Sequence, residues 1–121
     1  MEHRIQSLRT FIGAKSFDES RAFYTAWGFE EVVVSPKMSL FRANGFGFYL
    51  QDYHIDDWVN NSMVFMETDN VERYWNELVA LNLPSQFPTV KLTPIKEDWW
   101  GRECFVHDPS GVLWHIGEFK K

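Results

Sequence analysis

Apolar residues recur along this chain with two spacings, one typical of β-strands and one typical of α-helices. The same order of strand-like and helix-like segments occurs twice. A short apolar run over 8–14 predicts a strand. Ala22, Phe23 and Trp27 then share one face of a helix predicted over 19–27. Runs typical of strands follow at 29–34, 38–42 and 46–51.

The second half of the chain repeats this order after a polar stretch without strand periodicity, 52–61, which we interpret as a linker. A strand is predicted over 62–67, and an amphipathic helix from Val71 to near Asn82. A short segment at 90–92 and strands at 103–107 and 112–119 complete the chain, with loops over most of 83–99.

Local signals mark where these elements begin and end. Ser16 to Glu19 and Asp69 to Glu72 each have the spacing of a helix capping box. Gly28 is suited to end the first helix in the left-handed conformation. Tight turns are predicted at 43–45 and 108–111.

The elements therefore read β-α-β-β-β twice, which predicts an α+β fold. We expect a single domain over 1–121, with module one at about 8–51, the linker at 52–61 and module two at about 62–119. Neither module can cover its own sheet well, so we expect pairing of the modules to bury both helices in one core.

Composition narrows the classes of function. Twelve basic and 17 acidic residues give a net charge of -5, and no basic run indicates nucleic-acid binding. No apolar run reaches the roughly 18 residues of a membrane span, and the chain starts without a signal-peptide pattern. With Cys104 as the only cysteine, a cytoplasmic protein is expected.

Aromatic residues make up 17% of the chain, which is high for a small domain. At least half of them are expected in the core. The others are candidates to line an apolar ligand cavity or a subunit interface.

Two motifs resemble a known family. Ser20-Arg21-Ala22-Phe23-Tyr24 followed by Trp27-Gly28-Phe29 is similar to one signature of the vicinal oxygen chelate superfamily. The turn at 108–111, followed by Val112-Leu113-Trp114-His115, is similar to its second signature. Within that superfamily, which includes glyoxalase I and ring-cleaving dioxygenases, the chain looks most like bleomycin resistance proteins, with Trp99-Trp100-Gly101 as local support. The resemblance implies a curved mixed sheet around a cavity.

In metal-dependent members of that superfamily, four strands supply His, Gln or Glu ligands. The matching positions here are Arg9, Tyr49 (or Leu50 if the register moves by one), Met63 and His115. Arginine keeps its proton, and a thioether is poorly matched to Zn, Ni, Fe or Mn. Only His115 would coordinate readily, so we expect no metal and no cofactor. We interpret His54 and His107 as hydrogen-bonded structural residues.

Strand alternation assigns the side chains of the strands to two opposite faces. The set predicted to pack under the helices is Ile12, Phe48, Val64, Met66, Trp114 and Ile116. The set predicted to line a small-molecule pocket is Arg9, Phe11, Gly47, Tyr49, Gln51, Met63, Phe65, Glu67, Leu113 and His115. Trp99 and Trp100 either stack on the ligand or take a packing or dimer-contact role.

The first functional hypothesis is a metal-free binding protein that sequesters a planar or cationic small molecule, such as an antibiotic. The resemblance implies a homodimer that binds its ligand in grooves between subunits. The alternative is a metal-free lyase or isomerase in which His115 or Glu67 acts as general base and Arg9 stabilises an oxyanion. Two further alternatives are a metal-dependent enzyme akin to glyoxalase I or to fosfomycin-modifying transferases, and a structural or regulatory partner domain, for which no residue gives positive support.

Overall fold

A computed structural model describes all of residues 1–121 and contains the predicted order of elements twice. Module one consists of β1 (Phe11–Gly13), α1 (Phe17–Trp27), β2 (Glu30–Ser35), β3 (Met38–Ala43) and β4 (Phe46–Gln51). A short helix, α2 (Asp56–Asn60), connects the modules. Module two consists of β5 (Met63–Glu67), α3 (Val71–Ala80), α4 (Leu83–Gln86), β6 (Lys91–Glu97), β7 (Gly101–His107) and β8 (Leu113–Phe119).

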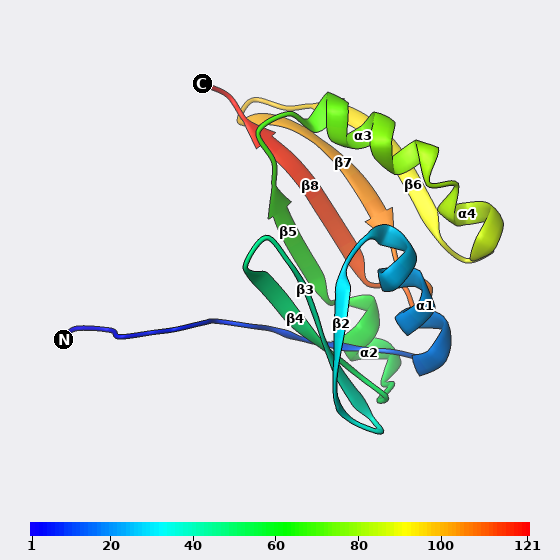
Figure 1. Cartoon of the computed structure of the whole chain (residues 1–121). Helices are drawn as coiled ribbons and strands as arrows, with labels where there is room; N and C mark the ends of the chain where they lie inside the picture. Colours follow the sequence, from blue (N-terminus) through cyan, green and yellow to red (C-terminus); the bar gives the residue numbers. More distant parts are fainter.

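The strands form two four-stranded mixed sheets with matching topology. Sheet A has the order β1-β4-β3-β2, and sheet B has the order β5-β8-β7-β6. In each sheet the first strand of the module pairs in parallel with the last, and the other pairs are antiparallel. Helices α1, α3 and α4 all lie on the same side of the two sheets, at the right in Figure 1. The opposite side of each sheet carries no helix, and we call it the open face.

Most of the predicted start and stop signals are present in the structure. The Ser16 hydroxyl accepts a hydrogen bond from the backbone N–H of Glu19, and Gly28 ends α1 with a φ of 108°. Helix α3 is capped one residue later than predicted, because the Asn70 side chain, and not Asp69, accepts the backbone N–H of Arg73. Asn44 and Gly45 both have positive φ, as a two-residue hairpin turn requires.

Three local predictions were incomplete. The polar segment 52–61 contains α2, whose Val59 is fully buried, so tertiary packing supports a helix too short for a visible period. The stretch 83–99 holds α4 and the whole of β6, not only loops. Strand β1 begins at Phe11, so Arg9 precedes the strand predicted to contain it.

Aromatic side chains from both modules form a common core against helix α1. Phe23 on this helix packs edge-on against Phe87 of module two, with ring centroids 5.5 Å apart. Trp27 packs edge-on against Trp114 of β8 at 5.0 Å. The high aromatic content is therefore used largely in the interior. No helix of the protein combines the length and apolar character needed to cross a membrane.

A buried polar network joins the two modules through Tyr24. Its hydroxyl donates a hydrogen bond to Asp108 Oδ2 (2.7 Å) and accepts one from Trp114 Nε1 (3.0 Å). Asp108 Oδ1 accepts the backbone N–H groups of Ser110 and Val112 (both 2.9 Å). Burial raises the pKa of Asp108, and the hydrogen bonds from Tyr24 and the turn oppose that rise. Burial also raises the pKa of Tyr24, so its hydroxyl keeps the proton that it donates.

We expect Y24F to lower the free energy of unfolding by about 2 kcal/mol. The substitution keeps the buried ring but leaves Asp108 Oδ2 and the Trp114 indole N–H each without a hydrogen-bond partner. Urea denaturation followed by circular dichroism measures the change. The matched control is Y53F, because the Tyr53 side chain is 54% exposed. Equal stability of the two variants would contradict a joining role for Tyr24.

A second linkage ties α1 to sheet A at a half-exposed position. Arg21 Nε donates to Glu31 Oε2 at 2.6 Å, and the buried Ser39 donates to the same oxygen at 2.7 Å. The Arg21 guanidinium lowers the pKa of Glu31 below its usual value. A lowered pKa in the folded state means that this stabilisation is present near neutral pH and is lost as the pH falls.

We expect E31Q to destabilise the protein by roughly 1 kcal/mol at neutral pH, a modest cost because Arg21 is open to solvent. The difference from the wild type should shrink as the pH falls below about 4.5, the ordinary pKa of a glutamate, because the stabilisation by ionised Glu31 is then progressively lost. The urea midpoints of E31Q and of the wild type, measured across this pH range, test the expected change in stability. The control is E30Q, whose partner Arg42 is exposed. A difference independent of pH would exclude the proposed charge effect.

Candidate functional site

Alternation along the strands separates core residues from open-face residues as the sequence predicts. Ile12, Phe48, Trp114 and Ile116 are at most 3% exposed, and Val64 and Met66 pack partly buried against the same core. Their neighbours in sequence lie on the helix-free side. The open faces carry the predicted site residues in two separate groups, one on each sheet.

The group on sheet A is centred on Tyr49. Phe11 pairs with Tyr49 across the parallel strands, and the two rings stack with centroids 5.0 Å apart. Arg9 Nη1 donates a hydrogen bond to Tyr49 Oη at 3.2 Å, and the guanidinium lies 5.7 Å from the ring centroid. Arg9 thus holds a fixed positive charge beside an exposed aromatic pair.

The group on sheet B is centred on His115, which lies between a carboxylate and a thioether. His115 Nδ1 is 2.7 Å from Glu103 Oε1, and the two side chains are 25% and 12% exposed. His115 Nε2 is 3.5 Å from Met63 Sδ. Phe105 packs edge-on against the imidazole at 5.2 Å, and Phe65 stacks on it at 6.4 Å.

Three aromatic rings continue this surface toward the end of β8. Phe65, Trp100 and Phe119 contact one another with centroids 5.2 to 5.9 Å apart. A Cβ at Gly117 would lie 2.6 Å from Phe65 and 3.0 Å from Trp100, so a larger residue at this position would force one or both rings to move. Phe65 and Phe119 are still 46% and 48% exposed.

The other predicted site residues lie at the margins of the Tyr49 and His115 groups. Gln51 and Glu67 are the last residues of β4 and β5, and neither side chain forms a hydrogen bond or ion pair. Trp99 is 83% exposed and has no aromatic neighbour, unlike Trp100. No hydrogen bond, ion pair or aromatic contact joins the two groups within one chain.

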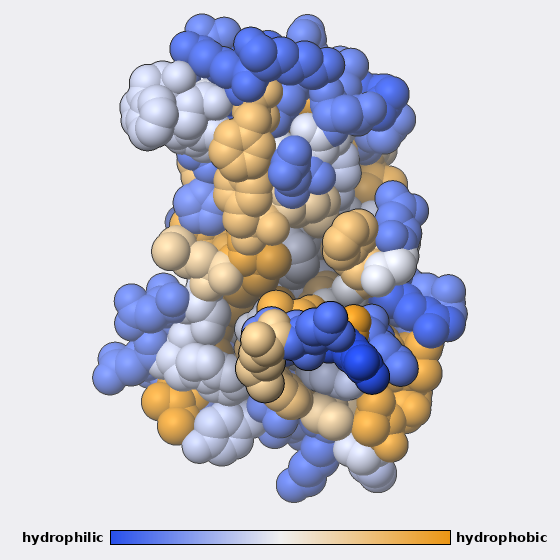
Figure 2. Space-filling view, turned by 90° about the vertical axis from the view of Figure 1, so that its left-hand side faces the viewer, coloured by the Kyte–Doolittle hydropathy of each residue, from blue (hydrophilic) through white to orange (hydrophobic).

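Figure 2 looks onto the open side of the molecule, with module two in its upper half. Orange apolar side chains gather there in a column that descends from near the top to the middle of the view. The large apolar residues of the open faces that are exposed are Phe11, Met63, Phe65 and Phe119. An apolar surface of this kind is typical of a binding site or an interface.

Sequence reasoning missed Glu103 and Phe105, although it predicted their strand. Both pair with β8 on the open side, Phe105 directly opposite His115. The same alternation that assigned His115 to this face would have assigned them too, once β7 was recognised as the neighbour of β8. Cys104, between them, points to the core, and burial raises the pKa of its thiol to about 11, so it is no nucleophile.

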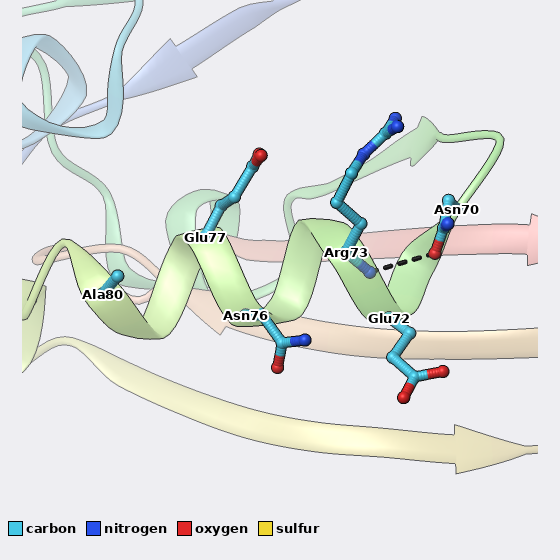
Figure 3. A pocket seen from close by; sticks show the side chains of 6 residues that line it. All are labelled: Asn70, Glu72, Arg73, Asn76, Glu77 and Ala80. Atoms are coloured by element: carbon cyan, nitrogen blue, oxygen red, sulfur yellow. Dashed lines mark hydrogen bonds between the residues drawn. The ribbon is translucent and has the colours of Figure 1, made fainter.

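Two hollows lie elsewhere. One, of about 450 Å³, follows the outer surface of α3, and Figure 3 shows that its side chains come from this helix and from its N-cap residue, Asn70. Its lining residues are Asn70, Glu72, Arg73, Asn76, Glu77 and Ala80. The other, of about 170 Å³, lies where β6 and β8 end and β7 begins, and it shares Phe119 with the aromatic cluster. Neither contains His115 or Tyr49.

Histidine and acidic side chains do not gather into a metal centre of the usual kind. No three or more His, Cys, Asp or Glu residues are close enough together to hold an ion. Arg9 and Tyr49 contact each other on sheet A, whereas Met63 and His115 contact each other on sheet B. His54 is hydrogen-bonded as predicted, through Nε2 to Asp56. The buried Nδ1 atoms of His54 and His107 have no hydrogen-bond partner.

Solved structures provide the clearest comparison. The bleomycin-binding protein of Streptomyces verticillus, solved with copper(II)-bleomycin, superposes with a TM-score of 0.82 over 98% of this chain and 100% of its own, at 16% identity. The chain therefore has the bleomycin resistance–glyoxalase fold. The fold implied by the sequence motifs is confirmed.

The same fold is shared by proteins with different activities. TnmS3, an antibiotic-binding protein from Streptomyces sp. CB03234, matches with a TM-score of 0.73 and 17% identity over 98% of this chain and 100% of its own. A lactoylglutathione lyase from Agrobacterium tumefaciens matches with a TM-score of 0.68 and 16% identity over 94% and 98%. No protein-family model and no curated protein sequence matches the chain. The bleomycin resistance–glyoxalase fold is thus compatible with both binding and catalysis.

We expect Glu103 to fix the tautomer of His115. An ionised carboxylate only accepts hydrogen bonds, so in the neutral imidazole the proton belongs on Nδ1, and Nε2, which lies against Met63 Sδ, carries the lone pair. In E103L the neutral ring should lose this preference and shift toward the Nε2–H form. Nitrogen-15 NMR of the histidines at alkaline pH, where imidazoles are neutral, measures the ratio.

The matched control is E67L, on the same open face but without contact to His115. Its histidine spectrum should equal that of the wild type. A wild-type spectrum with the proton on Nε2 would rule out the assigned orientation.

Proposed function

We propose that this protein binds a planar or cationic small molecule on its open faces and sequesters it without chemical change. The observation that carries the proposal is the exposed aromatic surface around Phe65, Trp100 and His115, with the Glu103 carboxylate beside it. Flat ligands stack on such rings, and a carboxylate favours a positive charge. The antibiotic-binding proteins that share the fold support the same class of function.

A second copy of the chain would complete this site. In one chain the Arg9–Tyr49 group and the Met63–His115 group are separate, and each leaves apolar side chains exposed. We propose a homodimer in which sheet A of one copy faces sheet B of the other across a groove. The ligand would then lie between Tyr49 and Phe11 of one copy and Phe65 of the second, a more enclosed site than one chain offers.

The proposed function does not need the metal centre found in enzymes of this superfamily. Arg9 cannot release its proton to become a ligand, and Met63 offers a soft sulfur where those enzymes use harder donors. In the proposed role Arg9 contributes its charge and its contact with Tyr49. Gln51, Glu67 and Trp99 are proposed to contact the ligand at the margins of the groove.

The alternative function is a metal-free lyase or isomerase, favoured by one contact. Glu103 orients His115 as a carboxylate orients the imidazole base of many enzymes, so Nε2 is suited to accept a proton. An enzyme would convert its ligand, whereas a sequestering protein returns it unchanged. The fate of the bound molecule therefore separates the two functions.

We expect bleomycin or a planar cationic dye of the acridine class to bind in equilibrium dialysis and to raise the thermal midpoint. F65A should weaken binding about tenfold or more, since it removes one stacking face. The control is F46A, because Phe46 is 80% exposed at the start of β4, away from these rings.

The same samples test the two related proposals. Light scattering should give twice the 14.4 kDa chain mass, and mass spectrometry should recover the ligand unmodified. Failure of every such ligand to stabilise the wild type, or equal binding by F65A and F46A, would count against sequestration on this face. Conversion of the ligand would favour the enzyme.

A further inference from the structure

The tip of the β3–β4 hairpin consists of Asn44 and Gly45, and both residues are exposed. The Asn44 side chain makes no hydrogen bond, and the backbone N–H of Gly45 has no acceptor. A Cβ at Gly45 would meet nothing within 4 Å, so the space around its nitrogen is open. The side-chain carbonyl carbon Cγ of Asn44 and the amide nitrogen of Gly45 are therefore both free to react.

These two atoms are the partners of a reaction that needs only water. The bond between Gly45 N and Asn44 Cγ forms, the Cγ–Nδ2 bond breaks, and Nδ2 leaves as ammonia with the proton that Gly45 N gives up. Water then opens the cyclic imide at either of its carbonyl carbons, which yields aspartate or isoaspartate. Glycine in the second position favours the attack, because it has no side chain to shield the nitrogen and few forbidden backbone angles.

Asn82 provides a comparison within the same chain. It is exposed, its side chain makes no capping hydrogen bond, and its φ of 55° is close to the 52° of Asn44. The residue that follows it is Leu83, whose side chain is fully buried at the start of α4. Packing of that side chain holds the backbone that would have to turn for ring closure. Asn61 and Asn70 use their side chains in hydrogen bonds.

Ring closure at Asn44 requires the hairpin tip to open locally. Ala43 and Phe46 pair directly below the tip, and Phe46 is 80% exposed, so opening this pair uncovers little apolar surface. Segments with few buried apolar contacts and solvent-exposed hydrogen bonds open most readily. The tip can therefore reach the reactive geometry while the rest of β3 and β4 stays paired.

We infer that Asn44 is a site of spontaneous covalent modification, in which it is deamidated through a cyclic imide with Gly45. The aspartate product preserves the hairpin, because Asp-Gly forms the same two-residue turn as Asn-Gly. The isoaspartate product adds a methylene group to the backbone of the turn, so the strand pairing that the turn fixes is disturbed beside it. The inference is independent of the proposed ligand sequestration, because the hairpin tip carries none of the proposed ligand contacts.

The test is prolonged incubation of the folded full chain at mildly alkaline pH, followed by tandem mass spectrometry of its peptides. Exchange of ammonia for water should add about 1 Da at Asn44 and leave Asn82 unchanged. Methyl transfer from S-adenosylmethionine by an isoaspartyl methyltransferase counts the isoaspartate. N44G keeps a turn that tolerates positive φ and should abolish this signal, whereas the matched control N82G should not change it.

Hydrogen exchange separates the effects of the two products. The isoaspartyl form should exchange the amides of β3 and β4 beside the tip faster than the wild type, whereas freshly purified N44D should match it. An intact Asn44 in the folded chain after this incubation would overturn the inference, and a parallel sample unfolded in guanidinium would show whether the fold protects it. Equal modification of Asn44 and Asn82 would also overturn it, because the free tip and its glycine would then decide nothing.

Discussion

The buried hydroxyl of Tyr24 lies where the two modules meet, and the arrangement of the molecule depends on its hydrogen bonds. Tyr24 belongs to α1 of module one, whereas its partners Asp108 and Trp114 belong to the last hairpin of module two. A polar group in this position is costly unless every partner is satisfied, so the network specifies one relative orientation of the modules. The rings of Phe23, Trp27 and Phe87 supply the apolar contacts around it.

This shared core places all the larger helices on one side of the sheets and leaves the other side uncovered (Figure 1). Side chains that a closed fold would bury are therefore exposed, among them Phe65 and Phe119. The chemistry available there follows from one histidine. Glu103 orients the His115 ring on one edge, Met63 lies at the other, and Phe105 supports it from β7. This surface therefore offers a ligand aromatic rings for stacking and the charge of the Glu103 carboxylate.

Much of the site follows from strand alternation, but its pairings do not. Alternation placed Phe11, Tyr49, Phe65 and His115 on the open faces, as the structure confirms. It could not place Glu103 beside His115, because the two are joined only through the β7–β8 register. Likewise the four positions compared with metal ligands divide into two contacting pairs, Arg9 with Tyr49 and Met63 with His115, on different sheets.

The element order, the caps at Ser16 and Gly28, the Asn44-Gly45 turn and the two faces of the strands could all be predicted from the residues alone. These depend on interactions within a few residues, so local chemistry is sufficient. Only the tertiary structure decided that α2 is a helix, that Tyr24 joins the modules and that His115 meets a carboxylate and a thioether. Those features connect residues far apart in the chain, and their partners are set by the packing of one module against the other and by strand register.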